Sequence, residues 1–378
     1  MARQCLLAFV VSRAIVWAAG VAAALTLDSS APRLSRPVDL GHTADVLAAP
    51  GVRWDATWYL EIAREGYASE LHAAFFPLYP LTVSAVSFVL GSPVIAGLLV
   101  SCIAFMAALL ALWRLAELEL DAAAAGRTVW LLALFPASLF FSAVYAESLF
   151  LALTVGAFLS ARQGRWGRAA LLGAAAGATR NTGWLLIVPL ALMYWQARPA
   201  GGRRLDRDAL WLALVPAGAA AFAAYQWAHF GDPLTGARAQ RFWGREFVGP
   251  LRGLQAVAEN LWTSVSNLVQ GVNVASDLRQ LALLAGMTLA VVALVGAARR
   301  LPAPYAVWAG LGILAMLSAP MPDYPLSATP RFLAVLFPLF MWGGAALARR
   351  DLYLLVLGAS TAGLVFLTAE FSTWRFVS

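Results

Sequence analysis

The sequence contains no lysine and little charge of either sign. Charged residues make up 12% of the chain and hydrophobic residues 61%, whereas an ordinary soluble domain carries about 25% charged residues. A soluble globular protein is therefore excluded. The absence of lysine also excludes a phosphate-binding loop of the Gly-x-x-x-x-Gly-Lys kind. We attribute the exclusive use of arginine to the codon bias of a GC-rich bacterial genome.

Cysteine and histidine are scarce as well. Cys5 and Cys102 both lie within apolar segments, so neither a disulfide framework nor a thiolate metal site is indicated, and we assign both to packing. The three histidines, His42, His72 and His229, are too far apart for a metal motif, and no His-Glu-x-x-His or Cys-x-x-Cys pair occurs. We therefore expect no metal ion and no other cofactor.

Long apolar runs are what the sequence has in abundance. Runs of roughly 16 to 23 apolar residues recur along the chain, each long enough to span a bilayer core or nearly so. The net charge of +7 does not indicate nucleic acid, because the arginines are dispersed and no basic aromatic strip is present. We predict an all-α polytopic membrane protein whose partner is the lipid bilayer. Residues 1–378 form one membrane-embedded unit without repeats.

Arginine clusters predict the topology, because short cytoplasmic loops collect them. The first span covers residues 5–27, and Arg3 favours a cytoplasmic N-terminus. A cleaved signal peptide is the alternative, which the length of this stretch and the interruption by Arg13 disfavour. The clusters expected in the cytoplasm are Arg114 with Arg127; Arg162, Arg165 and Arg168; Arg198, Arg203, Arg204 and Arg207; Arg299 with Arg300; and Arg349 with Arg350.

The remaining crossings follow from these clusters. Only about 28 residues separate the clusters that end at 168 and begin at 198, so the chain there must form a short hairpin with Arg180 at its tip. In all we expect roughly eleven crossings and an external C-terminus. The other crossings are 94–115, 128–144, 146–161, 208–228, 279–298, 303–319, 331–348 and 351–369.

Two long external segments result, residues 28–93 and residues 229–277. The apolar stretch 75–90 within the first would otherwise be a crossing. Because it is short and carries prolines near its start, we expect a helix lying at the membrane surface. The second segment is amphipathic and contains Arg238, Arg241, Arg245 and Arg252, on the side where positive charge is usually scarce.

Asp55 is the first candidate for chemistry. On a helix, Trp54, Trp58, Tyr59 and Ile62 share one apolar face, and Asp55 falls inside that face. Burial against aromatic rings raises the pKa of a carboxyl group and suits it to take a proton from an alcohol. A helix N-cap is an equally good interpretation, because an Asp before an apolar-periodic run is a common cap.

Glu147, Arg180 and Arg331 are further candidates. Glu147 is the only acidic residue between Asp121 and Asp206, and an ionisable group among membrane spans is by default a functional candidate. A carboxylate at a water-exposed turn is the alternative. Arg180 and Arg331 suit bidentate binding of a phosphate, although each arginine alone could serve a lipid headgroup. Together with the arginines of 229–277, they indicate an anionic ligand entering from the external leaflet.

A series of motifs in a fixed order resembles one enzyme family. It comprises Trp54-Asp55, Trp58-Tyr59, Ile62-Ala63 and Gly66-Tyr67; Phe75-Phe76-Pro77-Leu78-Tyr79-Pro80-Leu81; Phe135-Pro136; Tyr145-Ala146-Glu147-Ser148-Leu149-Phe150; Ala178-Thr179-Arg180; Gly231-Asp232-Pro233 with Gln240 and Trp243; and Pro330-Arg331-Phe332. This series is similar to the blocks of the GPI mannosyltransferase II family and its bacterial homologues.

The resemblance implies the glycosyltransferase C fold, with an external active site and a polyprenyl-phosphate sugar as donor. It implies that Asp55 is the catalytic base, that Glu147 is the second acidic position of such enzymes, and that Arg180 lies beside the donor phosphate. Mannose follows from the resemblance alone. The acceptor does not carry over, because a bacterium lacks GPI precursors, so we expect a glycolipid or glycan.

We therefore expect an inverting glycosyltransferase of a bacterial inner membrane, with its active site facing the periplasm. Asp55 and Glu147 are the expected catalytic residues, and a metal is not required because arginine neutralises a lipid monophosphate. A lipid-linked sugar transporter or flippase and a non-catalytic membrane scaffold are the alternatives. Our assignments are Arg180, Arg331 and Arg241 for the donor phosphate, and Trp54, Trp58, Tyr59, Tyr145 and His72 for the acceptor or sugar.

Overall fold

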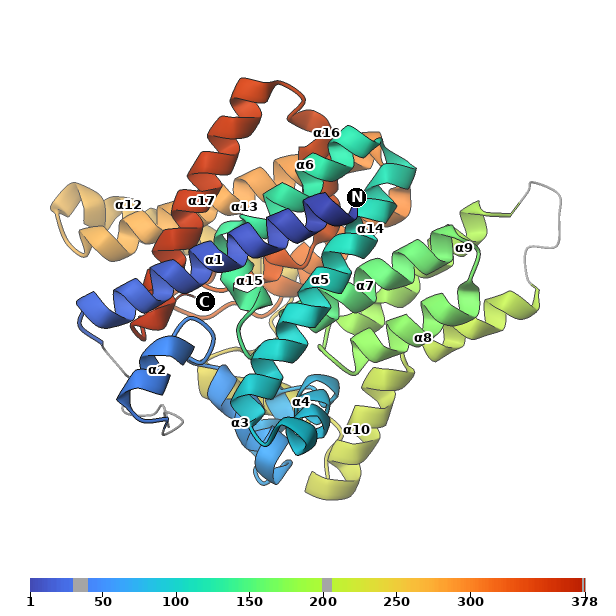
Figure 1. Cartoon of the computed structure of the whole chain (residues 1–378), viewed down its shortest axis with the longest axis horizontal. Coiled ribbons are helices and arrows are strands. Elements are labelled where there is room, and N and C mark those ends of the chain that lie inside the picture. The colour runs from blue at the N-terminus through green and yellow to red at the C-terminus, as the bar shows by residue number, and fades with distance from the viewer. Residues whose placement is uncertain (30–39, 199–205, 376, 378) are drawn as a thin grey trace.

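The computed structural model describes residues 1–29, 40–198, 206–375 and 377 of the chain. Within those ranges the regular structure is helical throughout (Figure 1), as the apolar runs predict. The elements are α1 (Ala2–Thr26), α2 (His42–Ala48), α3 (Ala56–Glu65), η1 (Glu70–Ala74), α4 (Leu78–Leu90), α5 (Pro93–Glu119), α6 (Ala122–Ala133), η2 (Pro136–Phe141), α7 (Glu147–Arg162), α8 (Trp166–Gly177), η3 (Gly183–Leu186), α9 (Ile187–Gln196), η4 (Arg207–Leu214), α10 (Ala217–Phe230), α11 (Thr235–Ala239), η5 (Gln240–Trp243), α12 (Pro250–Gln270), α13 (Val274–Arg300), α14 (Ala303–Leu317), α15 (Thr329–Ala334), α16 (Phe337–Ala346) and α17 (Arg350–Ser372).

Five helical segments among the described residues are long and apolar enough to cross a membrane: α1, α5, the continuous segment η4–α10, α13 and α17. The chain is therefore a multi-pass membrane protein. Every other segment expected to cross is also helical, but shorter; α14, for example, has 15 residues and rises only about 22 Å against a hydrocarbon core of about 30 Å. The total of eleven crossings stays a prediction.

The expected crossings 128–144 and 331–348 are each interrupted near a proline. The stretch 128–144 is divided between α6 and η2, which begins at Pro136. The stretch 331–348 is divided between α15 and α16, which carries Pro338 in its first turn. Proline has no backbone N–H and its ring clashes with the preceding turn. Each of these two crossings is therefore divided into two shorter helices.

Arg13 of α1 lies against the first of these interruptions. Its side chain is buried, and Nη1 donates to the carbonyl of Ser138 at 2.7 Å and to Oγ of Ser142 at 2.8 Å. Nη2 donates to the carbonyl of Ala133 and to the hydroxyl of Ser138. A broken helix leaves carbonyl groups that lipid cannot satisfy. Arg13, which interrupts the apolar run of α1, thus supplies hydrogen-bond donors at the break between α6 and η2.

The end of α5, the end of α7 and the start of α14 meet at one face of the bundle, and each lies close in sequence to one of the arginine clusters. Arg162, at the end of α7, donates through Nε to Oε1 of Glu119, the last residue of α5, at 2.6 Å. The Tyr305 hydroxyl, from the first turn of α14, donates to the same oxygen at 3.0 Å. These contacts agree with the predicted grouping of arginine clusters on one side. Arg203 and Arg204 lie outside the described residues.

The apolar stretch 75–90 forms the short helix α4, as its prolines predict. Pro77 occupies the N-cap position and Pro80 lies in the first turn, where a missing N–H costs no hydrogen bond. With 13 residues, α4 rises only about 20 Å and cannot span the core. The Tyr79 hydroxyl lies 2.8 Å from Oγ of Ser101, which ties α4 to α5. Its location at the membrane surface stays a prediction.

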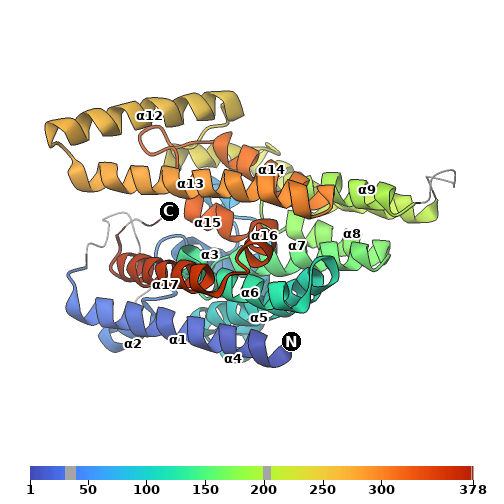
Figure 2. The same cartoon turned by 90° about the horizontal axis from the view of Figure 1, so that it is seen from above.

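The predicted hairpin and the second long connection are also present. The hairpin consists of α8 followed by η3 and α9, and Arg180 lies in the turn between them. Residues 229–277 contain α11, η5 and α12, and Figure 2 shows α12 lying beside α13 in the opposite direction. Gly253 of α12 faces the end of α14 closely, since a Cβ at this glycine would lie 1.7 Å from the carbonyl oxygen of Leu317.

Candidate active site

Asp55 lies at the N-cap position of α3, but its side chain does not cap the helix. Instead, Oδ2 accepts a hydrogen bond from Nη1 of Arg331 at 2.6 Å, and the side chain is 27% exposed. The expected enclosure by aromatic rings is therefore wrong, and the N-cap interpretation holds only for the backbone position. Trp54, just before it, has a φ of +55°, a conformation that is uncommon for bulky residues and that clusters at functional sites.

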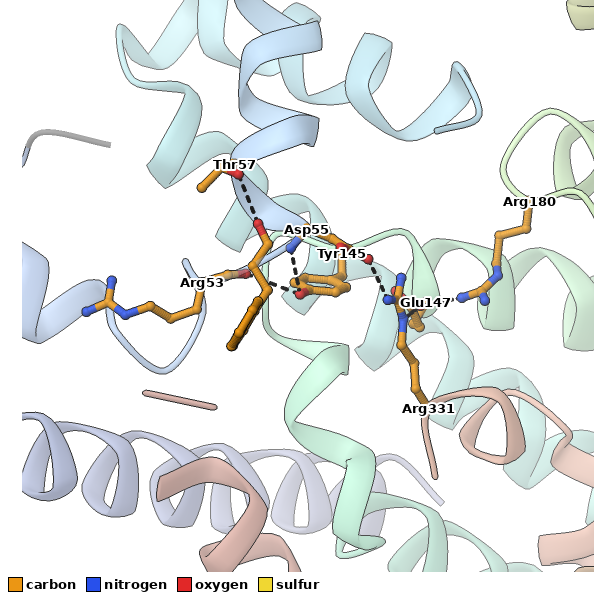
Figure 3. Close-up of polar contacts among 8 residues, drawn as sticks. Arg53, Asp55, Thr57, Tyr145, Glu147, Arg180 and Arg331 are labelled. Atoms are coloured by element: carbon orange, nitrogen blue, oxygen red, sulfur yellow. Dashed lines mark hydrogen bonds and ion pairs between the residues drawn. The ribbon is translucent and has the colours of Figure 1, made fainter. Parts of the chain in front are cut away.

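The Tyr145 hydroxyl fixes the backbone around Asp55. It accepts a hydrogen bond from the backbone N–H of Asp55 at 3.1 Å and donates to the carbonyl of Arg53 at 3.2 Å (Figure 3). Arg53 is held in turn by an ion pair with Asp45 at 2.8 Å. The loop that carries Asp55 is thus attached to the segment before α7, about ninety residues along the chain.

Glu147 is the centre of the cluster. It is the first residue of α7, its side chain is fully buried, and both Arg180 and Nε of Arg331 donate to its Oε1, the latter at 2.5 Å. The interpretation of Glu147 as a carboxylate at a water-exposed turn is therefore wrong. A buried carboxylate is costly unless it is paired and hydrogen-bonded, and here two guanidinium groups pair with it (Figure 3).

Arg331 of α15 joins the two carboxylates, since Nη1 reaches Asp55 and Nε reaches Glu147. Its guanidinium also lies 4.7 Å from the centroid of the Tyr145 ring. Arg180 contacts Glu147 from the hairpin turn. Because α7 begins at Glu147 and ends in the arginine-rich face, and Arg180 follows the far end of α8, the cluster lies at the opposite end of these helices.

Arg245 is the third arginine of the cluster. Its guanidinium lies 5.6 Å from the Phe332 ring, which Arg180 contacts at 5.2 Å. Burial, together with the nearby charge of Arg331, lowers the pKa of Arg245 to about 10, so it is still charged at neutral pH. Arg241, which we expected here, is 64% exposed and ion-paired with Glu246. The assignment of Arg241 to the donor phosphate stays a prediction.

A family model described as mannosyltransferase (PIG-V) matches residues 4–196, just over half of the chain. The chain belongs to this family. The matched segment contains Asp55, Glu147 and Arg180, whereas Arg245 and Arg331 come from the part of the chain beyond it. The resemblance inferred from the motifs is thereby confirmed.

Curated relatives point the same way. The chain is 32% identical over 167 residues to a GPI alpha-1,6-mannosyltransferase 2 of Cricetulus griseus, and 34% identical over 167 residues to that of Rattus norvegicus. Each match covers 41% of this chain. The matched region spans about a third of the length of these relatives, 33% and 34% respectively.

Among solved structures, the chain is similar to an oligosaccharyltransferase of Archaeoglobus fulgidus in complex with Zn and sulfate. The TM-score is 0.45 at 13% identity, over 96% of this chain and 53% of that chain. A second structure of the same protein, tethered to an acceptor peptide with an NVT sequon, gives a TM-score of 0.44 at 12% identity, over 96% and 55%.

Three of the five residues expected to bind sugar lie in the interior of this PIG-V family member. Tyr59 and His72 are each 5% exposed and Tyr145 is 1% exposed. Burial raises the pKa of the Tyr59 phenol, which stays neutral, and Nε2 of His72 lies 3.4 Å from Oε2 of Glu61. In this conformation the three side chains are covered by protein. Their assignment to sugar contact stays a prediction, and the Tyr145 hydroxyl also orders the loop of Asp55.

Trp54 and Trp58 are only half-buried and keep their assignment as a prediction. The Trp54 ring packs on Trp374 at 5.9 Å between centroids. The Trp58 ring meets Trp243 edge to face at 5.6 Å and stacks on Phe75 at 5.9 Å. Both indoles therefore border the connection that carries Asp55, where an aromatic face suits the apolar side of a sugar.

No group of three or more His, Cys, Asp or Glu side chains among the described residues has an arrangement that would hold a metal ion. The cluster contains two carboxylates, Asp55 and Glu147, and both are ion-paired with arginine. Three guanidinium groups against two carboxylates leave one net positive charge, which suits a phosphate ester. That the reaction needs no metal stays a prediction.

Proposed function

We propose that the chain is an integral membrane mannosyltransferase. It moves a sugar from a polyprenyl-phosphate donor to a hydroxyl of a lipid-linked or glycan acceptor, with inversion at the anomeric carbon. One observation carries the proposal: Asp55, Glu147, Arg180 and Arg331 come from separate parts of the chain and form one hydrogen-bonded cluster at the ends of several helices. Family membership supports the choice of mannose.

Asp55 is the general base in this proposal. Its Oδ2 is held by Arg331, while Oδ1 accepts no hydrogen bond from the described part of the chain and is left for the acceptor hydroxyl. The hydroxyl oxygen attacks the anomeric carbon, the bond from that carbon to the phosphate oxygen breaks, and the hydroxyl proton passes to Asp55. A positioned base contributes a factor of about 10² to 10⁴ to the rate.

The arginines bind the phosphate. Arg180 and Arg245 contact Phe332 through their guanidinium planes, and Arg331 uses Nε and Nη1 for carboxylates. The remaining N–H donors face a leaving group whose negative charge grows as the bond breaks, which fixed donors stabilise. Glu147 is a positioning residue, because it is fully buried and orients two of the three guanidinium groups.

We also propose the location. The cluster lies at the helix ends opposite the arginine-rich face, and arginine-rich loops remain in the cytoplasm. The active site then faces the exterior, or the periplasm if the membrane is a bacterial inner membrane. A donor with a polyprenyl tail reaches such a site from the outer leaflet, and the acceptor arrives as a glycolipid or glycan.

The test is transfer of labelled sugar from synthetic polyprenyl-phosphate mannose to a lipid extract of the host. It compares the purified wild type with Asp55→Asn and Glu65→Gln. Glu65 is an exposed carboxylate on the same helix, α3, and serves as the matched control. We expect turnover of Asp55→Asn to fall about 10² to 10⁴-fold and that of Glu65→Gln to remain at the wild-type level.

Two results would count against the proposal. Normal turnover by a folded Asp55→Asn protein would remove Asp55 as the base. If wild type transfers no sugar from any polyprenyl-phosphate donor, but carries such lipids across the bilayer of proteoliposomes, the protein is a transporter or flippase instead.

A further inference from the structure

A cavity of about 400 Å³ lies where α13 packs on α16, and none of its lining residues belongs to the candidate active site. Val291, Val292 and Val295 of α13 form its apolar wall and are 44 to 50% exposed. Because α13 is long and apolar enough to cross the membrane, an outward-facing wall of valines on this helix meets lipid rather than water.

One end of the cavity is basic. Arg299 and Arg300 belong to the last turn of α13 and line the cavity. Arg300 donates through Nη1 to the carbonyl of Ala345 at 3.1 Å, which holds its guanidinium against α16. Arg299 is exposed and makes no hydrogen bond or ion pair with the part of the chain that the structure describes. At about 1.5 Å per residue, Arg299 lies about 12 Å along the helix from Val291.

Trp342 of α16 forms the opposite wall. Its indole lies directly on Gly296 of α13, since a Cβ built there would lie 2.0 Å from Nε1. Only glycine allows this close approach. The cavity therefore combines a tryptophan of the kind that sits at membrane interfaces, a pair of arginines at the helix end, and an apolar wall below them.

We propose that this cavity binds one anionic phospholipid. The phosphate lies between Arg299 and Arg300, and an acyl chain follows the valines toward the middle of the membrane. The order of groups along α13, charge at the helix end and valine one to two turns deeper, matches the order of groups in a phospholipid. Basic pockets between membrane helices on the arginine-rich side recognise anionic headgroups, and guanidinium groups bind phosphate bidentately.

Arg349 and Arg350 provide a matched control. They are exposed, they flank the start of α17, and they do not line the cavity. Their cluster was assigned to the same membrane side as Arg299 and Arg300. Replacing either pair of arginines by glutamine changes the net charge by the same amount. A difference in lipid binding between the two variants would therefore come from the cavity and not from overall charge.

The experiment is native mass spectrometry of the delipidated full-length protein, titrated with phosphatidylglycerol or phosphatidylcholine of the same acyl chains. We expect wild type to retain one phosphatidylglycerol in preference to phosphatidylcholine. Each arginine near the membrane surface contributes a factor of about five in affinity, so Arg299→Gln with Arg300→Gln should weaken retention about 25-fold. Arg349→Gln with Arg350→Gln should leave it unchanged, and Val292→Trp, which fills the cavity, should abolish it.

Other outcomes overturn the proposal. Equal loss in both double-arginine variants would show non-specific charge attraction, and equal retention of phosphatidylcholine would remove the role of the arginines. A third titration uses polyprenyl phosphate, and tighter retention of this lipid than of phosphatidylglycerol would assign the cavity to a different lipid. If Val292→Trp changes the oligomeric state without changing lipid retention, the face is a contact between copies of the chain. Circular dichroism confirms that each variant is folded.

Discussion

Replacement of Glu147 by glutamine tests whether electrostatics hold the cluster together. Glu147→Gln keeps the volume and one acceptor oxygen but removes the charge that Arg180 and Arg331 share. These arginines are only 10% and 13% exposed, so water compensates little of the loss. Removal of one partner from a buried ion pair costs about 3–5 kcal/mol. Because Arg331 retains Asp55 as a second partner, we expect about 3 kcal/mol, the lower end of that range.

The assay is reversible unfolding in mixed micelles with increasing dodecyl sulfate, followed by tryptophan fluorescence. Wild type, Glu147→Gln, Arg180→Gln and the double variant form a double-mutant cycle. We expect the double variant to be more stable than the sum of the single losses predicts, with a coupling of about 1–3 kcal/mol. Glu65→Gln, on the surface of α3, should remain within about 0.5 kcal/mol of wild type.

Strictly additive losses in the cycle would show that Glu147 and Arg180 do not interact and would refute this prediction. The prediction would equally be refuted if Glu147→Gln unfolded at the wild-type detergent fraction, because a buried neutral side chain would then serve the cluster as well as a carboxylate.

Three further predictions concern the surroundings of the cluster. Arg245→Gln should raise the KM for the polyprenyl-phosphate donor about tenfold, because it loses one charge-assisted hydrogen bond of about 1.5 kcal/mol. Arg241→Gln should leave this KM unchanged. Equal effects of the two variants in donor titrations would contradict the assignment of Arg245 to the phosphate. Tyr145→Phe removes the hydroxyl that links the Asp55 loop to the segment before α7. We therefore expect kcat to fall about tenfold and the protein to lose about 1 kcal/mol of stability. An unchanged kcat in single-turnover kinetics would show that the loop is ordered without this hydroxyl. Arg13→Leu removes the guanidinium that donates to the carbonyl of Ser138 and to Oγ of Ser142 at the break after α6, whereas the carbonyl of Ala133 keeps the Ser138 hydroxyl as a donor. We expect the variant to be destabilised by about 3 kcal/mol, measured in the same micelles. A wild-type unfolding curve would mean that other groups satisfy the carbonyl of Ser138.

The sequence predicted the membrane segments well because hydropathy and proline position are local properties. The start of α4 after Pro77 and the hairpin turn at Arg180 both follow from residues next to them. The breaks after α6 and α15 were missed, although Pro136 and Pro338 are visible in the sequence. The high hydropathy of both stretches favours a membrane crossing despite the proline, and at the break after α6 the Arg13 side chain donates to the carbonyls of Ser138 and Ala133.

Asp55, Glu147, Arg180 and Arg331 of the candidate site were also predicted from the sequence, whereas Arg245 was predicted only as one of the four arginines of residues 229–277 and was not singled out. Arg241 and Arg245 are four residues apart and would share a face of a continuous helix. In the structure η5 ends at Trp243, and Gly244 follows in the left-handed region with a φ of +69°. The chain therefore reverses, and Arg245 reaches Phe332 while Arg241 stays in solvent. Gly244, directly before Arg245 in the sequence, was the available signal.

The burial of Glu147 could not be read locally at all. Its partners lie 33 and 184 residues away in the sequence, and only the packing of α7 against the hairpin and α15 brings them to it. The same holds for Tyr59 and His72, whose burial depends on neighbours from other segments. Sequence pattern gives the face of a helix on which a residue lies, but it does not show which distant element covers that face.

The position of Arg331 in the chain has a consequence for biosynthesis. Asp55, Glu147 and Arg180 all precede it, and Arg331 lies 276 residues after Asp55. Because the chain is synthesised from its N-terminus, Glu147 of α7 and Arg180 after α8 are both available early and can pair first. Asp55 has no Arg331 to pair with until α15 has been made. In a partly inserted chain, Asp55 is therefore not yet joined to Glu147 and Arg180. The complete cluster forms only near the end of membrane integration. The late arrival of one arginine thus delays the assembly of the whole site until nearly all helices have been made.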